Sequence, residues 1–121
     1  MTKQTQFQKR IASFKFAFNG IAYMLRTQRN AQIHFLAAVV VVVLGIVYKI
    51  ETLEWCLVIF ATGLVIIAEM FNTTIEFLID LITPEFQNKA GKAKDIAAGA
   101  VLIAAIVAAI IGLFVFIPKI F

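Results

Sequence analysis

Charged residues and cysteine are scarce in this sequence. Only 15% of its 121 residues are charged and 62% are hydrophobic, whereas soluble domains average about 25% charged and about 45–50% apolar residues. A chain this short has too much surface for its volume to hide so many apolar side chains from water, so we expect lipid to be its solvent. Cys56 is the single cysteine, which excludes an intramolecular disulfide. It lies in an apolar run and is expected to act as a small hydrophobic residue.

The sequence also lacks the motifs by which soluble enzymes bind nucleotides or metals. It has no P-loop, no glycine-rich phosphate loop, no pair of histidines spaced for zinc and no paired cysteines. A conventional soluble nucleotide-binding fold is therefore not supported. The polar residues 1–10 lead into no short apolar core with a small-residue cleavage site, so no cleavable signal peptide is expected.

Three stretches are long and apolar enough to cross a bilayer, which takes roughly 20 residues of helix. They cover about residues 31–48, 53–82 and 96–117. Before them, apolar residues recur at 3–4 spacing among polar and basic ones, which predicts an amphipathic helix at the membrane surface; a helix packed on its own protein is the alternative. The expected fold is one all-α membrane domain over residues 1–121, with residues 1–30 as its cytoplasmic surface segment.

Basic residues are distributed unevenly around these stretches. Of the 11 lysines and arginines, only Lys49 and Lys119 fall on the side reached after one or three crossings, and the other nine lie on the opposite side. By the positive-inside rule the N-terminus is expected in the cytoplasm and the C-terminus outside. The polar linker over residues 83–92, where Pro84 and Gly91 fit either a loop or frayed helix ends, would then face the cytoplasm, where ATP is.

The second stretch carries acidic residues, which are rare in membrane spans because burying a carboxylate in hydrocarbon is costly. A polar stripe about 16 Å long on one helix face is predicted from spacings of 3, 4 and 4 between its members. They are Glu69, Asn72, Glu76 and Asp80. Such residues can simply join helices by hydrogen bonds. Three carboxylates on one stripe, however, repel each other unless cations or protons are present, so the stripe is predicted to bind cations.

Lys94 and Asp95 stand at the start of the third stretch. Lys94 is either an anchor at the membrane surface or a point charge that holds a phosphate group. Asp95 is a candidate N-cap for the third helix. Carboxylates that hold Mg²⁺, with a lysine for phosphates nearby, are the groups that phosphoryl transfer requires.

Two segments carry a resemblance to a known family. Residues 69–80 read EMFNTTIEFLID, which is similar to the signature E-x-x-N-[ST]-x-I-E-x-x-x-D of prokaryotic diacylglycerol kinases. Residues 93–101 read AKDIAAGAV, which resembles the family segment A-K-D-x-x-x-A-A-V with Gly99 in place of the first alanine of the closing pair. Over nearly its whole length the chain resembles the diacylglycerol kinase and undecaprenol kinase family of integral membrane lipid kinases. Residues 26–34 look more like the undecaprenol kinase branch.

The resemblance implies an ATP- and Mg²⁺-dependent kinase that phosphorylates a membrane lipid alcohol, undecaprenol first and diacylglycerol next, in the bacterial inner (cytoplasmic) membrane. It implies a homotrimer with sites shared between neighbouring protomers, and no nucleic-acid partner. Glu69 is implied as the base that takes the lipid hydroxyl proton, with Ala98 beside the lipid. Asn72 would order the site, Asp80 would support it, and Glu76 would bind the metal. Nucleotide-contacting positions are implied at Lys9, Phe16, Gln28, Glu76, Glu85, Phe86, Gln87, Lys94 and Asp95.

The chain departs from the family pattern at residue 28. A second metal-binding glutamate usually precedes the first span, and Gln28 stands at that position. An amide oxygen still binds Mg²⁺ but brings no charge. Gln28 therefore stays a candidate metal ligand, and weaker metal binding, another metal stoichiometry or a water in its place are the alternatives. Nearby His34 is either another ligand or a hydrogen-bonded residue at the end of a span.

Two other functions are compatible with the sequence. A catalytically weak or inactive regulatory relative would account for Gln28. A small membrane transporter subunit would account for an acid within a span. Such transporters, however, generally have four spans and one buried acid, whereas this sequence has three spans and a stripe of acids.

Overall fold

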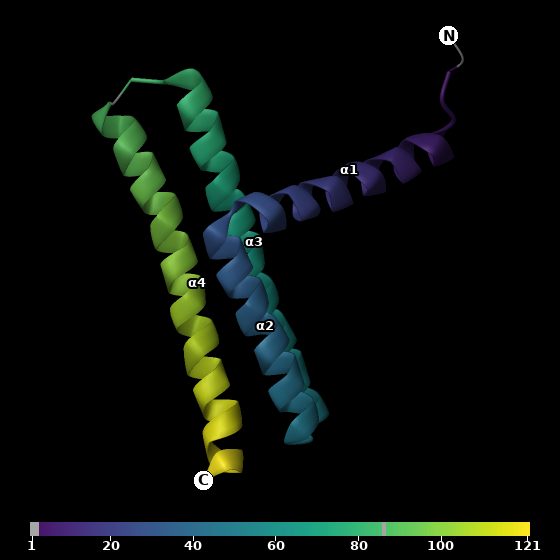
Figure 1. Cartoon of the computed structure of the whole chain (residues 1–121), viewed down its shortest axis with the longest axis vertical. Coiled ribbons are helices and arrows are strands. Elements are labelled where there is room, and N and C mark those ends of the chain that lie inside the picture. Colours follow the sequence, from purple (N-terminus) through teal and green to yellow (C-terminus); the bar gives the residue numbers. More distant parts are fainter. Residues whose placement is uncertain (1–2, 86) are drawn as a thin grey trace.

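The computed structural model describes residues 3–85 and 87–121, which form four α-helices. In chain order these are α1 (Gln6–Thr27), α2 (Arg29–Val47), α3 (Thr52–Ile82) and α4 (Asn88–Ile120). The predicted all-α class is therefore confirmed, and the last three helices are long and apolar enough to cross a membrane. Figure 1 shows these three helices as a bundle, with α1 pointing away to one side.

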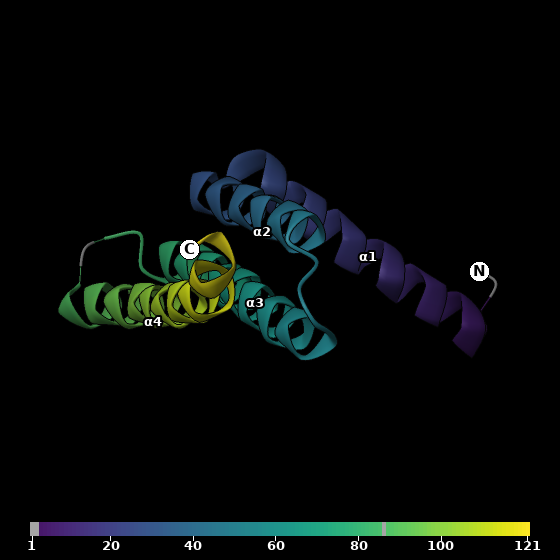
Figure 2. The same cartoon turned by 90° about the horizontal axis from the view of Figure 1, so that it is seen from below.

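α1 begins with a capping box and ends in contact with the bundle. The Thr5 hydroxyl accepts a hydrogen bond from the Gln8 backbone N–H at 3.1 Å, and the Gln8 side chain accepts one from the Thr5 N–H at 2.9 Å. At the other end Met24 is buried, and the Tyr23 ring lies edge-on to Phe77 of α3. The N-terminal half of α1 runs free of the bundle (Figure 1 and Figure 2). A helix therefore forms where one was predicted and packs on its own chain only at its C-terminal end, and its amphipathic placement on a membrane surface stays a prediction.

A single residue joins α1 to α2. Gln28 has an extended backbone (φ −106°, ψ 114°) and serves as the C-cap of α1 and the N-cap of α2. Its N–H donates to the Met24 carbonyl at 2.8 Å, which closes the last turn of α1. Gln28 thus forms the corner between the projecting helix and the bundle.

A tight turn over residues 48–51 joins α2 to α3. Lys49 adopts a left-handed conformation (φ 52°), and the Ile50 N–H donates back to the Gly45 carbonyl at 3.1 Å. Ile50 is buried in a small core with Val58 of α3 and Val115 of α4. This core fastens the three long helices together at one end of the bundle.

Two further contacts strengthen the same end. The Trp55 ring of α3 lies on Gly45 of α2, so closely that a Cβ at residue 45 would come within 2.5 Å of the ring. Lys119 Nζ of α4 lies 3.1 Å from Glu54 Oε1 of α3. Glycine at residue 45 is required here because any side chain would hold the two helices apart.

α3 and α4 pack against each other along their length, and α2 lies against α3 (Figure 1 and Figure 2). Residues 83–87 join α3 to α4, and α4 begins at Asn88 with Gln87 as its N-cap. The helix thus begins within the predicted linker over residues 83–92 and ahead of residue 96, where the predicted third span begins; the bounds of the span itself stay a prediction. Lysine and alanine favour helix, and one glycine, Gly91, costs only about 1 kcal/mol. Asp95 is consequently not the N-cap, because it lies inside α4.

Candidate functional site

The polar stripe predicted on the second span lies on α3, and its burial decreases along the helix. Glu69 and Asn72 are 3% and 5% exposed. Glu76 is half-buried and Asp80 is exposed. Asp80 also lies near the end of α3, beside the short connection to α4. The stripe therefore leads from the open end of α3 into the interior of the bundle.

Glu69 borders a small apolar cavity where α1, α2 and α3 meet. The cavity has a volume of about 150 Å³. His34 provides its only other polar side chain among the described residues, and His34 Nε2 lies 3.9 Å from Glu69 Oε2. That oxygen is buried and has no hydrogen-bond partner in the described part of the chain. The rest of the lining consists of Ile21, Met24, Leu25, Ala31, Phe35 and Ile66.

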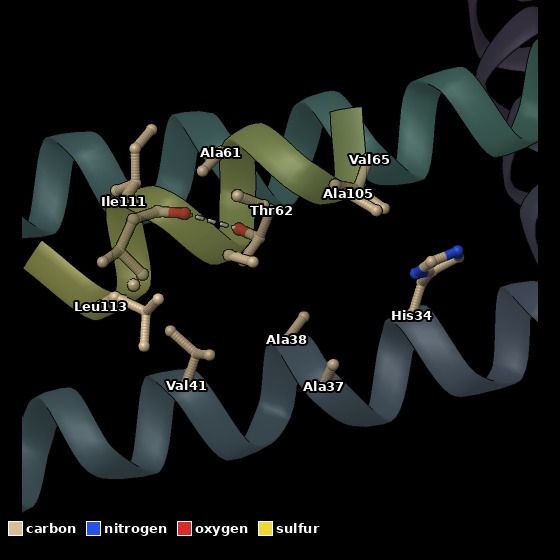
Figure 3. A pocket seen from close by; sticks show the side chains of 14 residues that line it. His34, Ala37, Ala38, Val41, Ala61, Thr62, Val65, Ala105, Ile111 and Leu113 are labelled. Carbon is tan, nitrogen blue, oxygen red and sulfur yellow. Dashed lines mark hydrogen bonds between the residues drawn. The ribbon is translucent and has the colours of Figure 1, made fainter. Parts of the chain in front are cut away.

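His34 also borders a larger apolar groove between α2, α3 and α4 (Figure 3). The groove has a volume of about 450 Å³. Small residues line much of it, such as Ala38 of α2 and Ala105 of α4 (Figure 3). The Thr62 hydroxyl also faces the groove, but it already donates to the Val58 carbonyl at 2.9 Å. The groove is therefore suited to an apolar occupant.

Asn72 and Glu76 form a pair further along α3. Asn72 Nδ2 donates to Glu76 Oε1 at 3.2 Å. Asn72 Oδ1 and Thr73 Oγ1 are buried with no hydrogen-bond partner among the described residues. Because buried polar atoms are nearly always paired, these oxygens and Glu69 Oε2 are candidates for contact with a further group. Sequence reasoning gave Thr73 no role, although it follows Glu69 by four residues, a spacing that shares one helix face.

Lys94 connects α4 to the outer end of the stripe. Its Nζ lies 2.6 Å from Asp80 Oδ1, with both side chains exposed. Ala97 is buried, whereas Asp95 and Ala98 are exposed. Within one chain α4 therefore places the ammonium group of Lys94 beside the stripe. Asp95 and Ala98, on the same helix, face away from the interior of the bundle.

Other predicted site residues lie apart from the stripe within one chain. Lys9 and Phe16 are exposed on the half of α1 that points away from the bundle (Figure 1). Glu85 and Gln87 are exposed in the α3–α4 connection, and Phe86 lies outside the described residues. A single chain therefore does not bring all the predicted nucleotide contacts together.

Gln28, which stands where a metal-binding glutamate was expected, is half-buried at the α1–α2 corner. Its Nε2 donates to Thr27 Oγ1 at 3.3 Å. Over residues 3–85 and 87–121, no three or more His, Cys, Asp or Glu side chains form a group that could hold a metal ion. Any metal site built on Glu76 must therefore take other ligands as well.

Comparison with known proteins decides the family. The family model described as prokaryotic diacylglycerol kinase matches residues 15–116. The chain belongs to this family. The undecaprenol kinase of Bacillus subtilis is 41% identical over 107 residues, which cover 88% of this chain and 87% of that protein. The diacylglycerol kinase of Synechocystis is 38% identical over 103 residues, which cover 84% of this chain and 59% of that protein. The diacylglycerol kinase of Escherichia coli K12 is 30% identical over 106 residues, which cover 88% of this chain and 87% of that protein.

As a member of the prokaryotic diacylglycerol kinase family, the protein is a lipid kinase and hence a phosphotransferase. The predicted family and enzyme class are confirmed, and a transporter subunit is not favoured. Family membership and three long apolar helices together indicate a membrane protein. The matched region contains both sequence motifs and leaves Lys9 outside.

Proposed function

We propose that this lipid kinase is an undecaprenol kinase, which transfers the γ-phosphoryl group of ATP to the hydroxyl of a prenol, with diacylglycerol as the next acceptor. The observation that carries the proposal is the position of Glu69, a buried acid at the inner end of a stripe whose outer end holds Lys94 and Asp80. A buried acid among apolar side chains can meet the hydroxyl of a lipid. A lysine at the exposed end of the stripe can bind the phosphates of a nucleotide. The 41% identity to the relative named undecaprenol kinase supports the first acceptor.

Glu69 is the proposed base at the acceptor end. The hydroxyl O–H bond breaks and its proton passes to Glu69, while the oxygen forms a bond to the γ-phosphorus. The bond from that phosphorus to ADP breaks at the same stage.

The apolar groove beside His34 offers about 450 Å³ for part of the lipid tail. Ala98, small and exposed on α4, is proposed to border the lipid.

Glu76 and Asn72 fit a Mg²⁺ site at the donor end. They offer a carboxylate and an amide oxygen, which are the oxygen ligands that Mg²⁺ prefers, and Asn72 Oδ1 has no partner in the described chain. Gln28 is the proposed further amide ligand. Mg²⁺ commonly keeps several waters and phosphate oxygens, so few protein ligands suffice. When bound, the ion neutralises charge on the phosphates. Lys94, held by Asp80, adds a second cation for them.

Complete sites are proposed to form between the chains of a homotrimer. α1 projects from its own bundle with Phe7 and Phe14 exposed, so its apolar side chains need a membrane surface or a neighbouring chain. An α1 that reaches the next protomer would carry Lys9 and Phe16 to the nucleotide bound there. The other proposed nucleotide contacts are Gln28, Glu76, Glu85, Phe86, Gln87, Lys94 and Asp95.

The proposed orientation puts the corner at Gln28 and the α3–α4 connection on the cytoplasmic side of the bacterial inner membrane. Nine of the 11 lysines and arginines lie on that side, just before α1, on α1, at the start of α2 and on the first turns of α4. Lys49 and Lys119 lie at the opposite end. By the positive-inside rule this distribution places the N-terminus inside and the C-terminus outside, with α1 on the inner membrane surface.

The test is phosphate transfer from labelled ATP with Mg²⁺ by the purified protein in lipid, with undecaprenol and diacylglycerol supplied in separate reactions. We expect label in undecaprenol at the higher rate, and its loss in the Glu69→Gln variant. Label in diacylglycerol alone would reassign the acceptor. Label in neither lipid, with nucleotide bound, would indicate an inactive relative and make Gln28 the first residue to restore to glutamate.

A further inference from the structure

The proposed mechanism assigns no task to His34, the one histidine of the chain. Its side chain is 22% exposed on α2, and its Nε2 lies 3.9 Å from Oε2 of Glu69, whose side chain is 4% exposed. The packing of α2 on α3 brings the two residues together, since they are far apart in the sequence.

Two polar side chains neighbour the Glu69 carboxylate, Asn72 on the same helix and His34 on α2. Glu69 Oε2 is buried without a hydrogen-bond partner in the described chain. Apart from His34, the side chains that line the cavity beside Glu69 in the described residues are apolar. Asn72, the next polar residue of the stripe, donates to Glu76 at 3.2 Å. The His34 imidazole is therefore a potential donor from another helix, with its Nε2 3.9 Å from Oε2.

We propose that His34 is a positioning residue for Glu69, which holds Oε2 through its Nε2–H so that Oε1 faces the lipid hydroxyl. The inference rests on the proposed role of Glu69 as the base. A base takes a proton efficiently only when it is well oriented, and a third group commonly supplies that orientation. The 3.9 Å separation is longer than a hydrogen bond, but catalytic contacts often tighten when substrate binds. During transfer the lipid proton passes to Glu69, and His34 keeps its own ring protons.

The location of His34 suits this task. It lines both the small cavity beside Glu69 and the larger groove between α2, α3 and α4 (Figure 3). A lipid tail in the groove would bring its hydroxyl end next to the imidazole. The ring would then separate Oε2 from the tail, and His34 would decide which oxygen of Glu69 the hydroxyl meets.

The contact can be tested without turnover, because one histidine gives one set of imidazole signals. Protein with nitrogen-15-labelled histidine, reconstituted in lipid, is compared by NMR with its Glu69→Gln variant. We expect the ring-nitrogen resonances to shift in Glu69→Gln. They should stay in place in the matched Glu54→Gln variant, since Glu54 pairs with Lys119 at the other end of the bundle. Unshifted resonances in Glu69→Gln would overturn the proposal.

Kinetics separates positioning from folding. His34→Leu in the full chain is expected to lower kcat at saturating lipid by about tenfold and to leave KM for ATP unchanged. The size of the loss is that seen when a residue that orients a metal-binding side chain is removed. His34→Gln keeps an N–H donor and should recover part of the lost kcat. Phe35→Leu changes the lining of the same cavity and should keep the wild-type kcat, which controls for repacking.

The experiments distinguish failure of the positioning role of His34 from failure of the proposed kinase function. Wild-type kcat in His34→Leu, or an equal loss in Phe35→Leu, would overturn the positioning role and leave the lipid kinase standing. Wild-type protein that labels no lipid would overturn the proposed function, while the imidazole resonances would still report whether His34 contacts Glu69. If His34→Leu does not fold, His34→Gln and the resonances of Glu69→Gln carry the test.

Discussion

Three oxygens define the candidate site at the scale of single residues. Glu69 Oε2, Asn72 Oδ1 and Thr73 Oγ1 are buried and unpaired on α3 within the described chain. A buried polar atom without a partner costs roughly 1–3 kcal/mol, and proteins accept such costs mainly at functional sites. We therefore expect substitutions on this face of α3 to change the reaction more than the fold.

Glu76→Gln is expected to abolish Mg²⁺-dependent turnover, a loss of roughly 100-fold or more, as for removal of one group that stabilises transition-state charge. The amide replaces the charged ligand at the proposed metal site. The measurement is kcat as a function of Mg²⁺ concentration. Glu54→Gln makes the same change elsewhere on α3, where the carboxylate contacts Lys119, and should keep turnover. Retained activity in Glu76→Gln would refute its role as a ligand.

Gln28→Glu is expected to raise the apparent Mg²⁺ affinity by about tenfold, equivalent to about 1.4 kcal/mol, because a carboxylate brings the charge that the amide lacks. The measurement is the Mg²⁺ concentration that gives half-maximal turnover. Gln32→Glu is the matched control, since the Gln32 side chain turns back to the Leu25 carbonyl at 3.0 Å. An unchanged Mg²⁺ dependence in Gln28→Glu would show that residue 28 does not face the metal.

At the scale of helices, local patterns could be predicted from the sequence, but contacts between helices could not. Apolar length and residue spacing predicted α1, α2, α3 and the polar stripe, because both are properties of one segment. The start of α4 at Asn88 was left open by the sequence, because Gly91 among polar residues fits a loop or frayed helix ends, although a helix tolerates it. The contacts of Lys94 with Asp80 and of His34 with Glu69 depend on how two helices turn toward each other.

Gly45→Ala is expected to destabilise the bundle by about 1–3 kcal/mol, the usual cost of overpacking. The added Cβ would lie 2.5 Å from the rigid Trp55 ring, so α2 must move away from α3. The measurement is thermal unfolding of the protein in detergent, and Trp55→Leu in the same chain should restore part of the loss. Gly63→Ala is the control, because its Cβ meets nothing within 4 Å in the chain. Equal stability of Gly45→Ala and wild type would contradict this packing.

At the scale of the whole molecule, one chain leaves its proposed nucleotide contacts apart. α1, which carries Lys9 and Phe16, runs out from the bundle (Figure 2). Lipid can cover exposed apolar side chains, but it cannot bring Lys9 to a bound nucleotide. A neighbouring protomer can do both, which supports the proposed composite site.

Mixed trimers are expected to regain activity from two inactive variants. One variant carries Lys9→Ala with Phe16→Ala, and the other carries Glu76→Gln. If α1 of one protomer completes the site of the next, every mixed ring of three has one site with both parts intact. A random 1:1 mixture should then reach about a quarter of wild-type turnover. The unmixed variants are the controls, and activity no higher than theirs would contradict sites shared in this way.

Gln28 is the single residue between α1 and α2, so its backbone torsions set the direction of the whole of α1. Two torsion angles, φ −106° and ψ 114°, fix the direction of a helix of 22 residues, which is about 33 Å long at 1.5 Å per residue. A rotation of about 10° at the corner would sweep its far end through about 6 Å. A change of backbone torsion at residue 28 would therefore move the proposed nucleotide contacts Lys9 and Phe16 together, while the residues of α3 keep their places.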